Sequence, residues 1–511
     1  MPKLLKPYLD FRGGENVDAA PDSLADNELM EGLNCDLDER GATSKRKGTA
    51  PINAVSYGAE VEQIIEWPRK DGTKVLLGIV GATLTKIADN GTKTDLKVLD
   101  NKEIGHFFYA DKFYFTGMES GTNKYWVYDG TTISEVTANA AGDNDLAPIK
   151  RCRRFLWHTK SQRIFAARDS SDLTALYYSE PGDPTYFKGT SKLFPTTGDG
   201  PVYNLSLFGE AMAVLYQNSI WAWKGVSPAT DAEWLKLPSE YGTLAARSPR
   251  LTPNSLTFLG QGGLISVSLG IVDQNIVMLT GEELIKNLAE NKVSKKIRAI
   301  TNPGIACAIY DRTNDRYLLA YADTEGATRN NKVLVLNWNL KSFTTYSSWQ
   351  VNDFLQRANG DILIATNGYI LKIGQGYRDF DTATGGYKAI TFRIKTKHWN
   401  LDYPFHTKKS KRLFVAAKQY DLETSSCDLT INADYESISF NSITLEDSFI
   451  WGEMWGNQWG YSDLTTKEIK FNKKGQRFQI TVENNSIDEP ITVYGMAFEY
   501  KLKKPKGERV S

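Results

Sequence analysis

The chain has 511 residues, of which 41% are hydrophobic and 12% aromatic, and this composition excludes an intrinsically disordered protein. Lysine plus arginine and aspartate plus glutamate each number 61, so the net charge is zero, and the basic excess of a dedicated nucleic-acid binder is missing. No segment has the apolar run of a signal peptide or the roughly 20 apolar residues of a membrane helix. We therefore expect a soluble protein made in the cytoplasm, with two or three domains of roughly 100–200 residues each.

The first 50 residues are rich in Gly, Pro, Asp and Asn and poor in apolar side chains. Such a composition is typical of turns and extended segments. We predict an extended arm over residues 1–51 that ends in a hairpin around Glu39–Gly41.

From residue 52 onward, one unit recurs: an apolar strand, a tight turn and a second strand that is often rich in aromatics. Seven pairs of segments follow this unit: Val75–Val80 with Ala82–Ile87, Lys112–Phe115 with Tyr125–Gly130, Arg163–Ala167 with Ala175–Ser179, Ala211–Tyr216 with Ser219–Gly225, Gly263–Val267 with Asn275–Leu279, Tyr317–Tyr321 with Lys332–Trp338, and Asp361–Thr366 with Tyr369–Ile373. Their spacing of about 37–53 residues matches one four-stranded propeller blade. We predict an all-β protein with a β-propeller of about seven blades over residues 52–385.

Helix signals are scarce. The strongest lies in Thr280–Asn291, where Leu284, Ile285 and Leu288 share one face over two or three turns. We expect a short helix in this segment.

After Gly385 the blade rhythm stops, and residues 386–511 have several segments in which apolar and polar residues alternate. These segments are Ile390–Lys397, Arg412–Ala417, Cys427–Asn432, Arg477–Val482 and Thr492–Lys501. Alternation is expected of two sheets packed face to face, so we predict an independent C-terminal β-sandwich.

Two features of this region are candidate interfaces. Trp451, Trp455 and Trp459 recur in a glycine-rich loop, where the rings either bind a partner or cover an open end of the sandwich. Residues 388–412 carry eight basic side chains, including Lys408 and Lys409, against Asp402 alone. This run forms either a solvated face or a docking surface for an acidic partner; nucleic acid ranks third because no aromatics interleave the lysines.

No catalytic or metal-binding spacing is present. The four histidines are His106, His158, His398 and His406; only His398 and His406 lie close together in the sequence, eight residues apart, and no Cys or third His is near them. The four cysteines lie more than 100 residues apart and fit small apolar fillers in a reducing compartment. Walker and Gly-x-Ser-x-Gly motifs are absent, as are the Asp-box turns of sialidases. We predict neither enzymatic activity nor a cofactor or metal.

Three stretches carry a family resemblance: the N-terminal arm, a blade turn and the C-terminal strand. Their segments are Phe11–Asn16, Asp26–Leu29, Leu33–Gly41 and Lys45–Gly48 in the arm, Leu176–Pro184 with Phe187 in the blade, and Phe498–Gly507 at the end. They resemble phage tail structural proteins, a family that includes the propeller-containing nozzle or hub proteins of short-tailed phages. The structural alternative for the arm is a hairpin packed on the first blade.

The resemblance implies a virion structural protein, assembled in the host cytoplasm and located in the tail. It implies a ring of copies, six in the expected case, around a channel through which genomic DNA passes without sequence-specific binding. The implied partners are further copies and adjacent head–tail adaptor or tail proteins, without membrane insertion. Arm residues Phe11, Arg12, Gly13, Gly14 and Asn34 are then candidate interface residues. The competing class is a carbohydrate- or receptor-binding propeller, a lectin or glycosidase-like protein.

Overall fold

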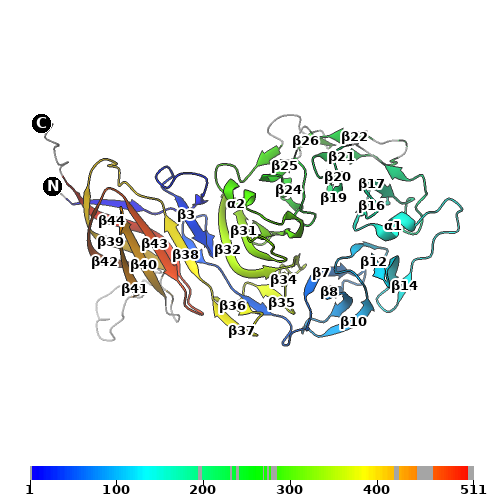
Figure 1. Ribbon diagram of the computed structural model, residues 1–511, viewed down its shortest axis with the longest axis horizontal. Coiled ribbons are helices and arrows are strands. Elements are labelled where there is room, and N and C mark those ends of the chain that lie inside the picture. Colours follow the sequence, from blue (N-terminus) through cyan, green and yellow to red (C-terminus); the bar gives the residue numbers. More distant parts are fainter. Residues whose placement is uncertain are drawn as a thin grey trace.

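The structure is a computed structural model that describes residues 3–193, 198–228, 230, 233–237, 241–268, 270–272, 275–277, 285–418, 420, 425–445 and 464–503. Nearly all regular structure is β, and the helices α1 (Ala147–Arg151) and α2 (Ser294–Arg298) each span little more than one turn. Figure 1 shows a ring of sheets beside a smaller β-domain. Over the described ranges, no helix is long and apolar enough to cross a bilayer.

The larger unit is a β-propeller, as predicted. Seven blades of four antiparallel strands make it up within the described residues; six are separate sheets, and the sixth, β29–β32, is part of a larger sheet. In chain order the blades are β7–β10 (Val61–Pro68, Lys74–Val80, Thr83–Ile87, Lys93–Val98), β11–β14 (Gly105–Tyr109, Lys112–Glu119, Thr122–Tyr128, Ile133–Glu135), β15–β18 (Arg154–His158, Arg163–Asp169, Asp172–Tyr178, Lys192–Leu193), β19–β22 (Val202–Phe208, Ala211–Tyr216, Ile220–Lys224, Glu233–Lys236), β23–β25 with β28 (Arg250–Thr252, Ser255–Gly260, Gly263–Ser268, Ile285–Asn287), β29–β32 (Cys307–Asp311, Arg316–Tyr321, Asn330–Asn337, Ser342–Val351), and β33–β35 with β6 (Asp353–Gln356, Ile362–Ala365, Ile370–Ile373, Thr49–Pro51). Tight turns join neighbouring strands: Ser120 and Gly121, between β12 and β13, both have positive φ, which suits a two-residue hairpin turn.

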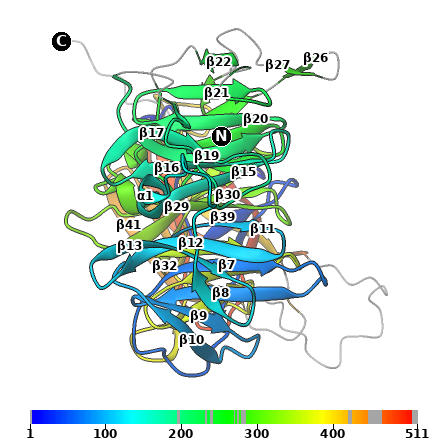
Figure 2. The same cartoon turned by 90° about the vertical axis from the view of Figure 1, so that its right-hand side faces the viewer.

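Packing between blades closes the ring. Seven buried apolar clusters each combine residues of two adjacent blades, so every blade is packed on both faces. The cluster that joins the last blade to the first contains Val61 and Ile64 from β7 with Leu363 and Ile370 from β34 and β35. The innermost strands β33 and β7 are also in contact. In Figure 2 the propeller lies in front, with its strands stacked blade over blade.

The seventh blade takes its outermost strand from the N-terminal arm. β6 pairs with β35 through Thr49, Ala50 and Pro51, opposite Ile373, Lys372 and Leu371. The side chain of Asn53 supports the same contact, because its amide bonds the backbone of Gly368 and Ile370 at 3.0 Å each. The arm therefore covers an edge that would otherwise expose unpaired backbone groups.

The expected helix over Thr280–Asn291 is wrong where the structure describes it. Residues Ile285–Asn287 form strand β28, which pairs with Ile265–Val267 of β25 as the outer strand of the fifth blade. Tertiary pairing overrides a short helical pattern here. The second half of the fifth sequence repeat, Asn275–Val277, instead forms a separate hairpin with Gly270–Val272.

The smaller unit is a β-sandwich, as predicted. One sheet contains β1 (Leu4–Tyr8), β4 (Cys35–Leu37), β5 (Thr43–Lys45), β39 (Lys408–Lys418), β42 (Leu464–Gly475) and β44 (Thr492–Leu502). The other contains β3 (Glu28–Leu33), β38 (Phe392–Thr396), β40 (Ser426–Ala433), β41 (Glu436–Thr444) and β43 (Phe478–Asn484). Apolar side chains from both sheets, such as Leu413, Ile431 and Phe498, fill the space between them.

The expectation of an independent sandwich needs a correction, because the arm supplies four of its strands. β1 and β5 pair with β44, β4 pairs with β5, and β3 pairs with β38. β3 also meets the outer strand of the sixth blade at Leu33 and Thr345, so one sheet runs from the propeller into the sandwich. The two domains are therefore joined by continuous hydrogen bonding as well as by the chain.

Candidate functional site

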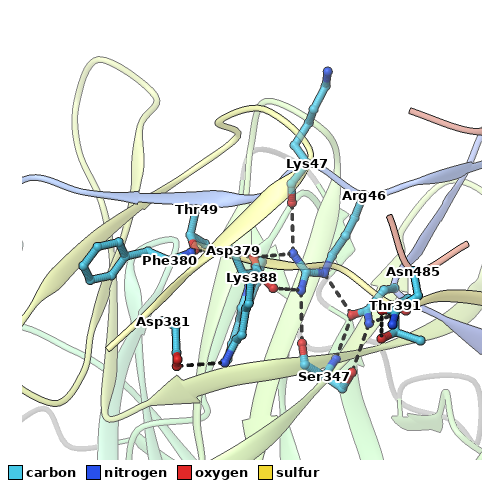
Figure 3. A network of polar contacts seen from close by, with 12 residues as sticks. Arg46, Lys47, Thr49, Ser347, Asp379, Phe380, Asp381, Lys388, Thr391 and Asn485 are labelled. Carbon is cyan, nitrogen blue, oxygen red and sulfur yellow. Dashed lines mark hydrogen bonds and ion pairs between the residues drawn. The ribbon is translucent and has the colours of Figure 1, made fainter. Parts of the chain in front are cut away.

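The junction between propeller and sandwich is organised around a buried arginine. The guanidinium of Arg46 donates to both carboxylate oxygens of Asp379, at 2.9 and 2.5 Å, and both side chains are 1% exposed (Figure 3). Arg46 also donates to the carbonyl of Ser347 at 3.0 Å and lies 4.5 Å from the ring of Trp349. It thereby links the arm, blade strand β32 and the hairpin of β36 (Arg378–Asp381) with β37 (Gly386–Ala389).

Asn34 belongs to the same network. Its side-chain oxygen accepts from Arg46 Nε and from the backbone N–H of Ser347, both at 2.9 Å. Its amide donates to the Thr391 carbonyl at 2.7 Å and to Ser347 Oγ at 3.0 Å. Asn34 is fully buried with a φ of 51°, a conformation that asparagine tolerates better than most residues. The interface that Asn34 forms in this structure is therefore one between parts of the same chain.

The other arm residues behave similarly. Phe11 is 2% exposed in the sandwich core. Gly13 and Gly14 are closely approached: a Cβ on Gly14 would lie 2.7 Å from the carbonyl oxygen of Phe343 in the sixth blade. Arg12 alone points outward, paired with Asp10 at 2.9 Å. The alternative interpretation of the arm, a hairpin packed on the propeller, therefore describes most of these residues. The blades involved differ, because the arm packs on the sixth and seventh blades rather than on the first.

The basic run over residues 388–412 does not form one face. Arg393 pairs with Glu483 at 3.0 Å, Lys397 with Asp26 at 2.7 Å, and Lys388 with Asp381 at 3.3 Å. Lys408 is fully buried and donates to the carbonyl of Gln476 at 2.6 Å, and burial lowers its pKa to about 8. The prediction of Lys408 as a surface interface residue is therefore wrong.

Lys409, in contrast, stands in a row of lysines on the outer face of the sandwich. It lies directly across from Lys474 on β42 and Lys501 on β44. Burial, together with the neighbouring Lys411, Lys474, Lys503 and Lys501, lowers the pKa of Lys409. No carboxylate within the described residues forms an ion pair with this row. Like charges placed across strands destabilise a sheet, so the row favours an external acidic partner.

Leucines extend this face. Leu5 of β1 lies directly opposite Glu499 of β44. Glu499 is two positions before Lys501 on the same strand, so Leu5, Glu499 and Lys501 are on the same face of the sheet. Leu5 and Leu9 are each 61% exposed. The predicted tryptophan loop, with Trp451, Trp455 and Trp459, lies outside the described residues.

The histidines and cysteines show no reactive arrangement. His158 is buried, with its ring nitrogens bonded to Ser161 Oγ at 2.8 Å and the Glu210 carbonyl at 2.9 Å. All four cysteines are buried and unpaired, as expected for apolar fillers. Across the described ranges, no group of three or more His, Cys, Asp or Glu side chains is arranged to hold a metal ion.

One cavity of about 200 Å³ lies between the sixth blade, the seventh blade and the β36–β37 hairpin. Its walls combine the aromatic rings of Trp349 and Phe380 with the polar side chains of Gln350 and Asn367. Thr366 also lines it, and the buried hydroxyl of Thr366 has no hydrogen-bond partner. The mixture of rings, amides and a hydroxyl suits a small polar ligand.

A second cavity, of about 280 Å³, lies between the β4–β5 turn and the sixth blade. Asp36, Asp38 and Glu39 line it together with Arg316. Arg316 already pairs with Asp36 at 2.8 Å and with Asp311 at 3.0 Å. These contacts fasten the arm to the propeller, and the cavity belongs to the junction.

A third group of side chains lies where the innermost propeller strands begin. Arg154, the first residue of β15, pairs with Glu103 at 2.8 Å. Arg168 follows Ala167, the residue opposite Arg154, and its guanidinium lies 4.8 Å from the ring centroid of Tyr203. Arg247, between the fourth and fifth blades, donates to the carbonyl of Glu62 at 3.4 Å. We call Arg153, Arg154, Arg168, Arg247, Glu103 and Tyr203 the axial cluster.

The charges of this cluster act on one another. Desolvation of the partly exposed Glu103 alone would raise its pKa, but the charges of Arg154, Arg247 and Arg168 hold it at about 2. Burial, with Arg154 next in importance, lowers the pKa of His106 to about 4, so this histidine is neutral at pH 7. Sequence inspection missed this site, because its members lie far apart in the sequence and are single arginines in unrelated contexts.

Neither a known protein family nor any curated protein matches this sequence. Among solved structures it is similar to the WD40 domain of Pan2 from Neurospora crassa, at 7% identity over 64% of this chain and 95% of that one, with a TM-score of 0.39. It is also similar to a catalytically inactive virginiamycin B lyase from Staphylococcus aureus with quinupristin, at 15% identity over 64% of this chain and 98% of that one, again with a TM-score of 0.39. The chain is an all-β protein built on a β-propeller; at these identities the likeness concerns the fold alone.

Proposed function

We propose that this chain is a non-enzymatic structural protein of a bacteriophage tail, which binds copies of itself and adjacent tail proteins in a ring around the DNA channel. The observation that carries the proposal is the outer face of the sandwich sheet. There, the unpaired row of Lys409, Lys474 and Lys501 adjoins the exposed Leu5. Exposed apolar side chains beside unneutralised charge are suited to a protein partner with an acidic rim.

The junction supports a structural role. Arm residues in the motif that resembles phage tail proteins fasten the sandwich to the propeller through Asn34 and Arg46. A continuous sheet spans both domains through β3 and β32. A subunit that must hold a fixed position in an assembly benefits from such a stiff connection, because less conformational freedom is lost on binding.

The test is electron microscopy and native mass spectrometry of the full chain, alone and after charge reversal of the row (Lys409→Glu, Lys474→Glu and Lys501→Glu together). We expect ring-shaped oligomers for the unaltered chain and mainly monomers for the variant. The matched control reverses three exposed lysines of the first blade, Lys70, Lys74 and Lys86, with the same change in net charge. Monomers in all three samples, or rings in all three, would count against the sandwich face as the assembly surface.

A second candidate function, carbohydrate binding, is favoured by the cavity that Trp349, Phe380, Gln350 and Asn367 line. Aromatic rings beside amides and a free hydroxyl are suited to the apolar face and hydroxyl groups of one sugar ring. Glycan-array binding that is lost in Gln350→Ala with Asn367→Ala would support this candidate. If no glycan on the array binds, carbohydrate binding is rejected, and the structural role remains the one proposed function.

A further inference from the structure

The axial cluster holds more positive than negative charge. Among the described residues, only Arg154 of its four arginines forms an ion pair with a carboxylate, that of Glu103. Arg153 instead bonds the amide oxygen of Asn123 and the carbonyl of Cys152, both at 3.3 Å. Arg247 bonds two carbonyls at 3.4 Å, and Arg168 stacks on Tyr203. Burial lowers the pKa of Arg153 and of Arg168, and neither forms an ion pair within the described residues. Desolvated guanidinium groups without an ion-pair partner are costly, so the positions of these two suit an anionic ligand.

The surrounding charges do not cancel this excess. Glu62 is paired with Lys102 at 2.8 Å. Asp353 lies near Arg247 and Arg250, and the backbone N–H of Ile64 donates to its carboxyl at 3.2 Å. Glu62 is thus neutralised by Lys102, and Asp353 acts on Arg247 and Arg250, which leaves Glu103 as the carboxylate that acts on Arg153, Arg154 and Arg168.

The backbone of Arg168 adopts a conformation that is unfavourable for a residue with a side chain. Its φ is +61°, which is unusual for a residue with a side chain, and it lies at the β-bulge between Ala167 and Asp169. Bulges turn a side chain away from the regular alternation and occur next to functional sites. Here the bulge places the Arg168 guanidinium on the ring of Tyr203, beside the strand that begins with Arg154.

One donor of the cluster is unused, and one side of the cluster meets solvent. Among the described residues the buried Nε of Arg154 has no hydrogen-bond partner, and the side chain of Glu103 is 42% exposed. Guanidinium groups present paired donors that match the oxygens of a phosphate or sulfate group.

We propose that the axial cluster binds a tetrahedral oxyanion, a phosphate or sulfate group, at the end of the propeller where the innermost strands begin. Arg168 provides the principal contact, Arg153, Arg154 and Arg247 add positive charge, and Glu103 keeps Arg154 oriented. The group comes either from a free inorganic ion or from a monoester on a larger molecule. This site is separate from the sandwich face, so it holds or fails independently of the proposed function.

Isothermal titration calorimetry of the full chain tests the proposal, with inorganic phosphate, inorganic sulfate and glycerol 3-phosphate as probes at constant ionic strength in chloride. We expect saturable binding that Arg168→Gln weakens by about tenfold, the effect of one lost hydrogen bond to a charged group. Glu103→Gln should strengthen binding, because it removes the competing carboxylate. Tighter binding of glycerol 3-phosphate than of inorganic phosphate would indicate a monoester as the ligand, and the reverse order a free ion.

Arg12→Gln is the control, since Arg12 is an exposed arginine paired with Asp10 on the arm. It should bind the probes as the unaltered chain does. Thermal melting establishes that each variant is folded before titration. The proposal is overturned if no probe binds in a saturable manner, or if folded Arg168→Gln and Arg12→Gln bind equally well.

Discussion

Arg46 and Asp379, which are 333 positions apart in the sequence, form an ion pair in which each side chain is only 1% exposed. The pair, shown in Figure 3, lies between the propeller and the sandwich. Asn34 accepts from Arg46, and Trp349 donates to Asp379. A buried ion pair contributes little net stability over an apolar replacement, but its directional contacts can select one arrangement of the parts that it joins. We therefore regard this pair as the element that orients the two domains.

Replacing Arg46 by methionine should destabilise the chain by about 3–5 kcal/mol, because Asp379 is left as an unpaired buried charge. Urea denaturation measures the change. Arg12→Met, which breaks an exposed pair, should cost at most about 1 kcal/mol. The double variant Arg46→Met with Asp379→Leu should recover much of the loss; a double variant as unstable as the single one would contradict this explanation.

Gly14→Ala tests the close approach of the arm to the sixth blade. The added Cβ would lie 2.7 Å from the Phe343 carbonyl oxygen at a φ of +67°. We expect a loss of about 1–3 kcal/mol from overpacking, in addition to about 1–2 kcal/mol of backbone strain. Gly72→Ala has a φ of +84° with nothing within 4 Å, so only the strain should remain. Equal losses in thermal or urea unfolding would show that the contact with Phe343 contributes nothing.

Glu103 should make the free energy of unfolding depend on pH in the acidic range. Its pKa is about 2 in the folded chain, against an ordinary value of 4.5. A carboxyl whose pKa is depressed by folding contributes stability above its unfolded pKa and loses it as the pH falls from about 4.5 toward 2. Urea midpoints of the unaltered chain and of Glu103→Gln should therefore differ most near pH 6 and converge as the pH falls toward 2. A difference that stays constant over this range would rule out the assigned interaction.

Lys408 and Lys411 should differ in reactivity toward an amine-directed acylating reagent. Lys408 is fully buried against the Gln476 carbonyl, whereas Lys411 is exposed on the same strand. Mass spectrometry after brief labelling of the native chain should find Lys411 modified and Lys408 protected. In urea both should react. Rapid native labelling of Lys408 would be inconsistent with its burial.

Closure of the ring by β6 can be tested with two propeller fragments, residues 49–389 and 52–389. The longer fragment retains Thr49–Pro51, which pair with β35, while the shorter one exposes that edge. We expect a higher melting temperature for the longer fragment and greater aggregation of the shorter one, because an unpaired edge recruits other strands. Identical melting and identical elution from a sizing column would show that β6 is dispensable.

Periodic local signals account for what could be predicted. The alternation of apolar residues and the repeated strand–turn–strand unit indicated both the propeller and the sandwich, because side chains alternate between the faces of a strand wherever it is placed. The same approach failed at Ile285–Asn287, where two or three turns of helical periodicity were weaker than pairing with β25.

The sequence by itself thus determined the all-β class, the number of blades to within one, and the strand-rich C-terminal region, since each follows from composition and from contacts between residues near in sequence. Only the tertiary structure decided that the arm belongs to both domains, that Lys408 is buried while Lys409 faces outward, and that the charges of Arg154, Arg168 and Arg247 all act on Glu103. These features depend on which distant strands meet and on the register in which they pair. A local pattern carries no information about either, because many partners would satisfy the same alternation.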